Sequence, residues 1–312
     1  MTRLLITGAD GFVGRWLVRA ARTQGHDVIA AVVPGAAAPA EWTDAAADAA
    51  VTTVLADLRE LEDLHRLADV RPDAVIHLAA IASGAEARKD PAAALAVNAE
   101  ATALLVSLLA NTGSPRFLFV SSGEVYGPGH SEPIDESAPR APRSPYAVSK
   151  AAGEGAVLAQ GKAGLPVLVA RPFTHTGPGQ ATAYVLPALT ARLIEAKRRG
   201  SSVVRTGNLQ AVRDFLDVRD VVRAYLLLLD RGEPGMIYNV ASGVGRTLSD
   251  CFAALAAIIG VDASATVDAA LARPDDIPVL IGDASRLRCA TGWAPEIPLD
   301  RTLQDLVNAQ AD

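Results

Sequence analysis

The residue types best suited to chemistry gather in "SSGEVYG", residues 121–127, and in "YAVSK", residues 146–150. Tyr146 and Lys150 are four residues apart on an expected helix, so both side chains share one face of it. A protonated amine at this spacing can lower the pKa of the phenol and make it a proton donor at neutral pH. Ser122 follows an apolar strand and can hydrogen-bond the substrate oxygen that Tyr146 would protonate. A lone Y-x-x-x-K is common by chance, so the prediction rests on both segments together.

A glycine-rich turn lies near the start of the chain, in "TGADGFVG". Gly8, Gly11 and Gly14 follow the apolar strand "RLLIT" and open a helix, with Phe12 and Val13 between them. Glycines at these positions allow a tight turn, a close approach of backbone N–H groups to a pyrophosphate, and close packing of helix on strand. The motif therefore predicts a dinucleotide site, although three glycines alone are a weak signal.

Two shorter segments support the same site. Asp57 and Leu58 follow an apolar run, where a carboxylate can hydrogen-bond an adenine edge. The segment "HLAA" places Leu78, Ala79 and Ala80 after another strand, close to the middle of a bound cofactor. Each segment alone is more often core packing, but their order along the chain is consistent with cofactor binding.

The elements that must position these residues alternate between short apolar strands and longer helices. Such a pattern predicts a Rossmann-type doubly wound parallel sheet, an α/β fold with helices on both faces. After about residue 172 the elements become shorter and are separated by Gly and Pro, which indicates a smaller C-terminal α/β lobe. We expect a dinucleotide-binding domain at residues 1–172 with a return segment at 210–241, and a substrate lobe at 173–209 and 242–312.

Composition limits the function classes. The 312 residues are 50% hydrophobic and carry a net charge of −6, so they offer no basic field for nucleic acid or anionic lipid. We find no export signal and no run of eighteen uninterrupted apolar residues, and so expect a cytoplasmic protein with small-molecule partners. Cys251 and Cys289 are expected to be reduced thiols, and the five histidines show no metal-ligand spacing.

The ordered motifs resemble the extended short-chain dehydrogenase/reductases, the NAD-dependent epimerase/dehydratase family, which act on nucleotide sugars. The similarity covers nearly the whole chain and includes the later segments "RPF", "RDFLDVRD" and "YNVASG". It implies that Ser122, Tyr146 and Lys150 carry catalysis. It also implies that Tyr146 and Lys150 contact the cofactor, together with the glycine turn and Asp57.

Within the family, "RPFTHTGPGQ" and "GNLQAVRDFLDVRDVVRAY" most resemble the branch that reduces GDP-4-keto-6-deoxy-D-mannose to GDP-D-rhamnose. The resemblance implies a GDP-sugar substrate, with Arg213 and Arg273 facing its phosphates and Ser122 and Glu124 at the sugar. Thr174 stands where the family usually has an Asn that contacts the substrate diphosphate. The implied reaction is reduction of the C4 keto group by NAD(P)H.

A 4,6-dehydratase and a 4-epimerase remain the alternatives. In the dehydratases a glutamate at the position of Glu124 takes a proton from C5, whereas here Glu124 could instead only position a hydroxyl or the loop. Gly123 weighs against dehydration, because related dehydratases carry an Asp or a hydroxyl residue there. A non-catalytic NAD(P)-binding regulator is also conceivable, but such relatives lose the tyrosine that this chain keeps as Tyr146.

Cofactor choice and assembly complete the expectations. The second strand, "DVIAAVVPG", ends without an acidic residue for a ribose 2′-OH and without an Arg for a 2′-phosphate. We expect NADP or NAD, with NADPH slightly favoured. The helices at residues 93–110 and 146–160 carry apolar residues on more than one side, so we expect a homodimer formed through a four-helix bundle.

Overall fold

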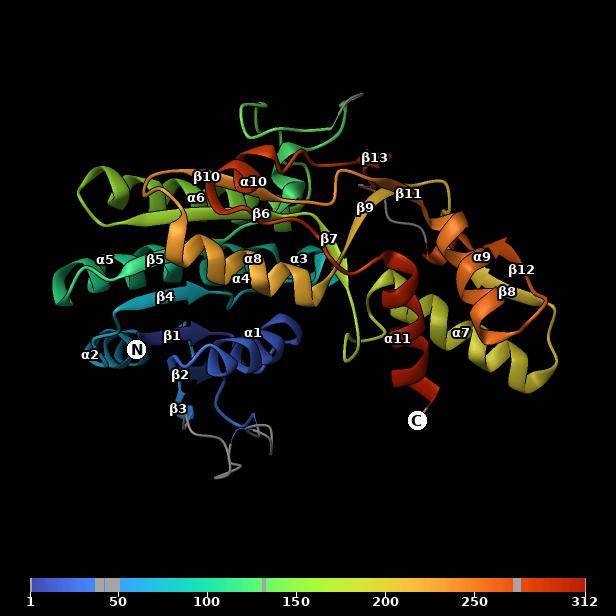
Figure 1. Cartoon of the computed structure of the whole chain (residues 1–312), viewed down its shortest axis with the longest axis horizontal. Helices are drawn as coiled ribbons and strands as arrows, with labels where there is room; N and C mark the ends of the chain where they lie inside the picture. The colour runs from blue at the N-terminus through green and yellow to red at the C-terminus, as the bar shows by residue number, and fades with distance from the viewer. Residues whose placement is uncertain (1, 37–41, 43–50, 131–132, 272–275, 312) are drawn as a thin grey trace.

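The computed structural model describes residues 2–36, 42, 51–130, 133–271 and 276–311. Within these residues, seven parallel strands form the main sheet in the order β10-β6-β5-β4-β1-β2-β3 (Figure 1). The strands are β1 (Arg3–Thr7), β2 (Asp27–Val32), β3 (Val51–Leu55), β4 (Ala74–His77), β5 (Arg116–Val120), β6 (Val167–Pro172) and β10 (Ile237–Val240). The expected Rossmann-type sheet is confirmed.

The order of the strands places the site. From β1 the chain steps outward to β2 and β3, and then returns to the other side of β1 as β4. Ligands of open α/β sheets bind beyond the carboxyl ends of the strands at such a reversal. The glycine turn after β1 and the "HLAA" segment after β4 therefore meet at one crevice.

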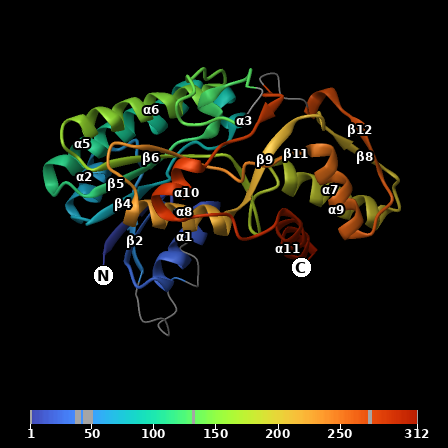
Figure 2. The same cartoon turned by 45° about the horizontal axis from the view of Figure 1, so that its top comes forward.

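Helices cover both faces of this sheet because its strands are apolar on both sides. Leu4 and Ile6 of β1 join an apolar cluster with α1 (Phe12–Thr23) and α8 (Val218–Arg231). Leu5, between them, faces the opposite cluster, which includes α2 (Leu61–Asp69), α5 (Thr102–Thr112) and α6 (Pro145–Lys162). Figure 2 shows α5 and α6 side by side along that face.

One long helical run precedes β5. It consists of α4 (Pro91–Leu95), a π-helical turn (Ala96–Ala101) and α5, and it follows the short α3 (Gly84–Lys89). By length and composition this run, Pro91–Thr112, could cross a membrane, and 44% of its most apolar window is buried in the protein. A core helix of a globular protein has the same properties.

The smaller lobe contains two short sheets. One joins β9 (Val212–Asp217) to β7 (Thr174–Thr176), β11 (Gly245–Thr247) and β13 (Val279–Leu280), and the other pairs β8 (Val203–Thr206) with β12 (Ser264–Val267). The helices α7 (Val185–Arg199), α9 (Leu248–Ile259) and α11 (Leu299–Ala311) enclose its apolar core. The expected return segment, residues 210–241, begins in this lobe with β9 and reaches the main sheet with α8 and β10. The remaining short helices are Gly123–Tyr126, Ala269–Leu271 and α10 (Ser285–Thr291).

Candidate active site

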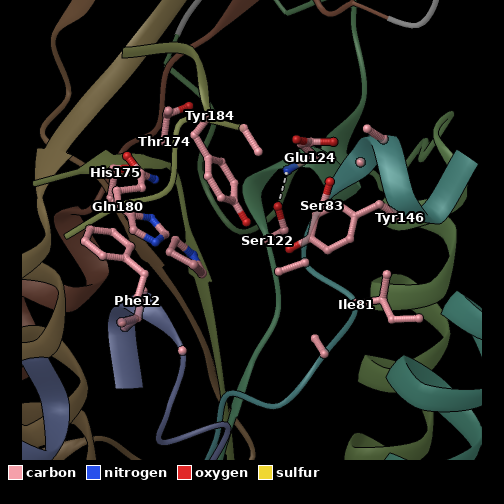
Figure 3. A pocket seen from close by; sticks show the side chains of 18 of the residues that line it. Phe12, Ile81, Ser83, Ser122, Glu124, Tyr146, Thr174, His175, Gln180 and Tyr184 are labelled. Atoms are coloured by element: carbon pink, nitrogen blue, oxygen red, sulfur yellow. Dashed lines mark hydrogen bonds between the residues drawn. The ribbon is translucent and has the colours of Figure 1, made fainter. Parts of the chain in front are cut away.

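A cavity of about 1120 Å³ lies between the carboxyl edge of the main sheet and the smaller lobe (Figure 3). Every predicted site residue that the structure describes lines it. These are Gly8, Gly11, Phe12, Val13, Gly14, Asp57, Leu58, Leu78, Ala79, Ala80, Ser122, Glu124, Tyr146, Lys150, Thr174 and Arg213. Arg273, predicted at the substrate phosphates, lies outside the described residues. The individual roles of the lining residues stay predictions.

The glycine turn fits a pyrophosphate. Gly8 has φ +66°, and a Cβ there would lie 2.9 Å from the backbone of Ala79. A Cβ at Gly14 would overlap the backbone oxygen of Gly8. Gly11 precedes α1 without a side-chain cap, so the first backbone N–H groups of the helix are left for an anion.

A buried histidine fixes the segment after β4. His77 Nδ1 lies 2.8 Å from Thr7 Oγ1, and His77 Nε2 lies 3.0 Å from Thr102 Oγ1. Burial, helped by the charge of Lys150, lowers the pKa of His77 to about 3. The backbone N–H of Ala79 also donates to Thr7 Oγ1 at 3.2 Å. The histidine is therefore a neutral link between β1, β4 and α5.

Asn98 holds the next stretch of the cavity wall, and the sequence analysis missed it. Its Oδ1 accepts from the backbone N–H of Ile81 at 2.8 Å, and its Nδ2 donates to Ile81 O at 3.1 Å and to Ser149 Oγ at 2.9 Å. Asn98 lies in the π-helical turn, and such turns often occur at functional sites. No local pattern in the sequence predicts this turn.

The expected catalytic helix begins where the sequence indicates. Ser144 caps α6 by accepting from the N–H of Ala147 at 3.1 Å, and Pro145 occupies the first turn. Tyr146 and Lys150 follow on the face toward the cavity. Lys150 Nζ donates to Val120 O at 2.8 Å, which ties α6 to the end of β5 just before Ser122.

The electrostatics of the pair differ from the expectation that Lys150 lowers the pKa of Tyr146. Burial raises the pKa of Tyr146, the charge of Glu124 raises it further, and a hydrogen bond with Ser122 opposes them. Burial also lowers the pKa of Lys150 to about 7, against the charge of Glu154. Desolvation is the largest cause in both cases, and it favours the neutral form of each group. The phenol is thus protonated at neutral pH.

Glu124 lies beside this pair. Its backbone N–H donates to Ser122 Oγ at 3.1 Å, and Ser144 Oγ donates to its carboxylate at 3.4 Å. Figure 3 shows Ser122, Glu124 and Tyr146 on one side of the pocket, with Tyr184 on the other. Ser144 and Tyr184 are further lining residues that the sequence analysis did not identify.

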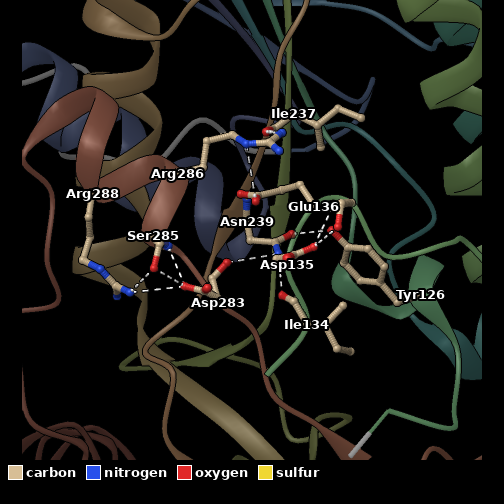
Figure 4. A network of polar contacts seen from close by, with 11 residues as sticks. Tyr126, Ile134, Asp135, Glu136, Ile237, Asn239, Asp283, Ser285, Arg286 and Arg288 are labelled. Atoms are coloured by element: carbon tan, nitrogen blue, oxygen red, sulfur yellow. Dashed lines mark hydrogen bonds and ion pairs between the residues drawn. The ribbon is translucent and has the colours of Figure 1, made fainter. Parts of the chain in front are cut away.

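Tyr126 anchors the "SSGEVYG" loop to the main sheet (Figure 4). Its hydroxyl donates to Asn239 Oδ1 at 2.7 Å, and Asn239 Nδ2 donates to Ile134 O at 2.8 Å and to Asp283 O at 3.2 Å. The backbone N–H of Asn239 donates to Glu136 Oε1 at 2.8 Å. These bonds join the loop to β10 and to the segment that follows β13. The position of Ser122 therefore depends on all three.

The smaller lobe forms the end of the cavity opposite the main sheet. Arg213 forms an ion pair with Asp276, and its Nη1 donates to Ile277 O at 2.6 Å. Arg192 of α7 lines the same region and donates to Arg205 O at 3.2 Å. Arg192 was not predicted, because a single Arg in an amphipathic helix carries no sequence signal. Two guanidinium groups at this end suit an anionic substrate.

The chain is similar to known nucleotide-sugar enzymes over nearly its whole length. Over 98% of its length it is 39% identical to the GDP-6-deoxy-D-mannose reductase of Pseudomonas aeruginosa, covering 96% of that protein. The structure of RMD from the same organism, complexed with NADPH, covers 99% of this chain with a TM-score of 0.83 and 36% identity, matching 98% of that chain. The UDP-glucose 4-epimerase of Thermotoga maritima, with UDP-glucose, gives a TM-score of 0.87 at 28% identity, over 99% of this chain and 98% of that one. The model of the NAD dependent epimerase/dehydratase family matches residues 4–241, and the chain belongs to that family.

Proposed function

We propose that this protein reduces the C4 keto group of a GDP-linked 4-keto-6-deoxy sugar with NAD(P)H, converting GDP-4-keto-6-deoxy-D-mannose to GDP-D-rhamnose. The observation that carries the proposal is the position of Tyr146, whose hydroxyl is hydrogen-bonded to Ser122 in the same cavity of about 1120 Å³ that the glycine turn lines. A keto reduction needs a proton donor at that place. Similarity to the reductase of Pseudomonas aeruginosa and to the RMD structure with NADPH supports the substrate class and the cofactor.

In this proposal each group of cavity residues binds a different part of the cofactor or the substrate. The glycine turn and the start of α1 would hold the pyrophosphate, Asp57 and Leu58 the adenine, and Lys150 the nicotinamide ribose. Bound NAD(P)H supplies the hydride. As negative charge develops on the C4 oxygen, Tyr146 donates its proton to that oxygen and Ser122 stabilises it by a hydrogen bond. The hydrogen bond from Lys150 to Val120 O holds α6 against the end of β5.

The geometry around Gly123 weighs against a dehydratase. A dehydratase needs an acid to expel the C6 hydroxyl, and here the residue beside Glu124 has no side chain. A Cβ at Gly123 would lie 3.2 Å from ring atoms of Phe173, which is buried and stacked against Tyr126 at 6.3 Å. A side chain at this position would therefore need the ring of Phe173 to shift by a few tenths of an ångström.

Cofactor stoichiometry tests the reaction. A dehydratase or an epimerase returns the hydride to the same sugar, whereas a reductase releases oxidised cofactor each cycle. We expect one NAD(P)H consumed per GDP-4-keto-6-deoxymannose, a product with a new C4 hydroxyl, and little cofactor retained through purification. The measurements are absorbance of the reduced nicotinamide and NMR of the product.

The Glu124→Gln variant is the matched control for that test. It should reduce turnover only modestly, because proton delivery comes from Tyr146 and not from Glu124. Conversion of GDP-mannose with no net change in nicotinamide absorbance would overturn the reductase proposal. It would identify Glu124 as a C5 base. Interconversion of C4 epimers with catalytic cofactor would support the epimerase alternative.

We also propose a cytoplasmic homodimer formed through a four-helix bundle. The helices α5 and α6 pack on the main sheet with one side. On these helices and on α4, Leu95 is 40% exposed, Leu104 49% and Val148 45%. Apolar side chains on a second side favour a second copy of the same helices as cover. The apolar composition of Pro91–Thr112 is consistent with such an interface.

A further inference from the structure

Among the residues that the structure describes, the end of β2 lacks the usual determinants of cofactor choice. In Rossmann folds an acidic residue after the second strand binds the ribose 2′-OH, or a nearby Arg accommodates a 2′-phosphate. Here β2 ends in Val32 and is followed by Val33, and both line the cavity. No Lys or Arg occurs between Arg22 and Arg59 in the sequence.

Arg59 reaches the same end of the cavity from the segment that follows the neighbouring strand, β3. Val32 of β2 pairs with Leu55 of β3, and the backbone N–H of Ala56 donates to Val32 O at 2.9 Å. The end of β3 therefore lies directly beside the end of β2. Arg59 follows this end by four residues and lines the cavity together with Val33.

The guanidinium of Arg59 is held by Asp57. Its Nε donates to the Asp57 carboxylate at 2.9 and 3.1 Å, and its Nη2 donates at 2.5 Å. The backbone N–H of Arg59 adds a bond to Asp57 Oδ1 at 3.0 Å. The pair fixes one edge of the guanidinium and balances the negative charge that Asp57 would otherwise present to a phosphate. A guanidinium has donors on more than one edge, so it can bind a second anion.

Other basic side chains of the cavity lie elsewhere. Lys150 donates to Val120 O at the end of β5, and Arg192 and Arg213 belong to the smaller lobe. Arg88 is in α3. Among the described residues that line the cavity, Arg59 is the basic residue on the β2–β3 side.

We infer that Arg59 recognises the 2′-phosphate of NADP(H), in place of a residue after β2. Phosphate is bound strongly by the planar fork of an arginine. In this arrangement Asp57 orients the guanidinium, and Arg59 makes the Asp57 carboxylate compatible with a phosphorylated ribose. The inference rests on the dinucleotide site of the proposed function, but it concerns only the adenosine half of the cofactor.

The test uses fragments of the cofactor, so it needs no sugar substrate. Dissociation constants of 2′,5′-ADP and 5′-AMP are measured by calorimetry for the full-length protein. Wild type should bind 2′,5′-ADP more tightly. Arg59→Gln should weaken 2′,5′-ADP by about tenfold or more, the factor expected from a lost charge-assisted hydrogen bond, and leave 5′-AMP nearly unchanged. Arg59→Lys should give an intermediate loss.

Arg66→Gln is the matched control. Arg66 is also exposed, pairs with Asp63 and donates to Leu55 O, but it does not line the cavity, so its loss should change neither constant. Equal binding of both fragments by wild type, or an equal loss for both in Arg59→Gln, would overturn the inference. Neither result would affect the reductase proposal, which is tested by sugar conversion.

Discussion

Burial shifts the pKa of both groups that are expected to act near the substrate oxygen. Tyr146 and Lys150 share one face of α6, and each is shifted toward its neutral form. For Tyr146 the shift changes little at pH 7, because an ordinary tyrosine is already neutral there and can donate a proton. For Lys150 the shift gives a pKa of about 7, so its charge is sensitive to pH near neutrality.

Tyr146→Phe should abolish most activity without affecting the fold. The substitution removes only the hydroxyl, so we expect turnover to fall by about 10²–10⁴-fold, the usual contribution of a general acid. Cofactor affinity and thermal stability should stay nearly unchanged. The measurements are steady-state kinetics, cofactor titration and a melting curve, and near-normal turnover would remove Tyr146 from this role.

Lys150→Met should reveal the depressed pKa of Lys150 as a dependence of stability on pH. Between about pH 7 and the ordinary lysine pKa of about 10.4, the unfolded chain binds a proton at residue 150 that the folded protein does not. The unfolding free energy of wild type should therefore rise with pH relative to the variant, by at most about 1.4 kcal/mol per pH unit. Urea unfolding of the cofactor-free proteins at about pH 7 and about pH 9.5 measures this. A constant difference would show that Lys150 is charged in the folded state.

At the scale of elements, the junction of β1 and α1 sets how closely backbone can approach an anion. Gly8 and Gly14 bring the strand, the turn and the helix within contact distances that a Cβ would prevent. The π-helical turn between α4 and α5 has a comparable effect, because it holds Asn98 against Ile81. Both devices position the backbone of the cavity wall, and neither uses the side chains that are predicted to be catalytic.

Gly14→Ala should damage this junction. Its Cβ would overlap the oxygen of Gly8, so α1 must shift, at a cost of about 1–3 kcal/mol in unfolding free energy and with weakened dinucleotide binding. Gly84→Ala is the control, because its Cβ would meet only the side-chain end of Arg88 at 3.5 Å. Denaturant unfolding and calorimetry with NADP⁺ compare the two variants. A Gly14→Ala variant with wild-type stability and wild-type NADP⁺ affinity would show that the turn tolerates a side chain at residue 14.

For the whole molecule, the site exists only where the two lobes meet. The larger domain contributes Ser122 after β5 and Tyr146 and Lys150 of α6, and the smaller lobe contributes Arg192 and Arg213. The helices α5 and α6 lie on the sheet face away from α1 and α8, as the two apolar clusters show. A dimer through α5 and α6 would therefore leave the face with α1 and α8 uncovered.

Leu104→Glu should convert the dimer to a monomer. Leu104 is 49% exposed on α5, and a charge there would be buried without a partner in a four-helix interface. Val267→Glu is the control, because Val267 is 69% exposed on β12 of the smaller lobe and should leave assembly unchanged. Sedimentation at micromolar concentration reports both. A monomeric wild type would reject the dimer proposal.

The sequence by itself determined the features that depend on short spacings. The parallel sheet follows from apolar strands alternating with helices, and the turn at Gly8–Gly14 follows from its place between a strand and a helix. Tyr146 and Lys150 share a face because they are four residues apart on one helix. The parallel direction of the strands brings residues that follow them, among them Asp57, Ala79 and Ser122, to one edge of the sheet.

Only the tertiary structure decided features that depend on distant segments. Asn98 contacts Ile81 and Ser149 through a π-helical turn that has no local signature. The pKa of Tyr146 is raised and not lowered, because burial by the surrounding chain and the charge of Glu124 both favour the neutral phenol. A spacing fixes which side chains share a face, whereas desolvation depends on everything that packs over them.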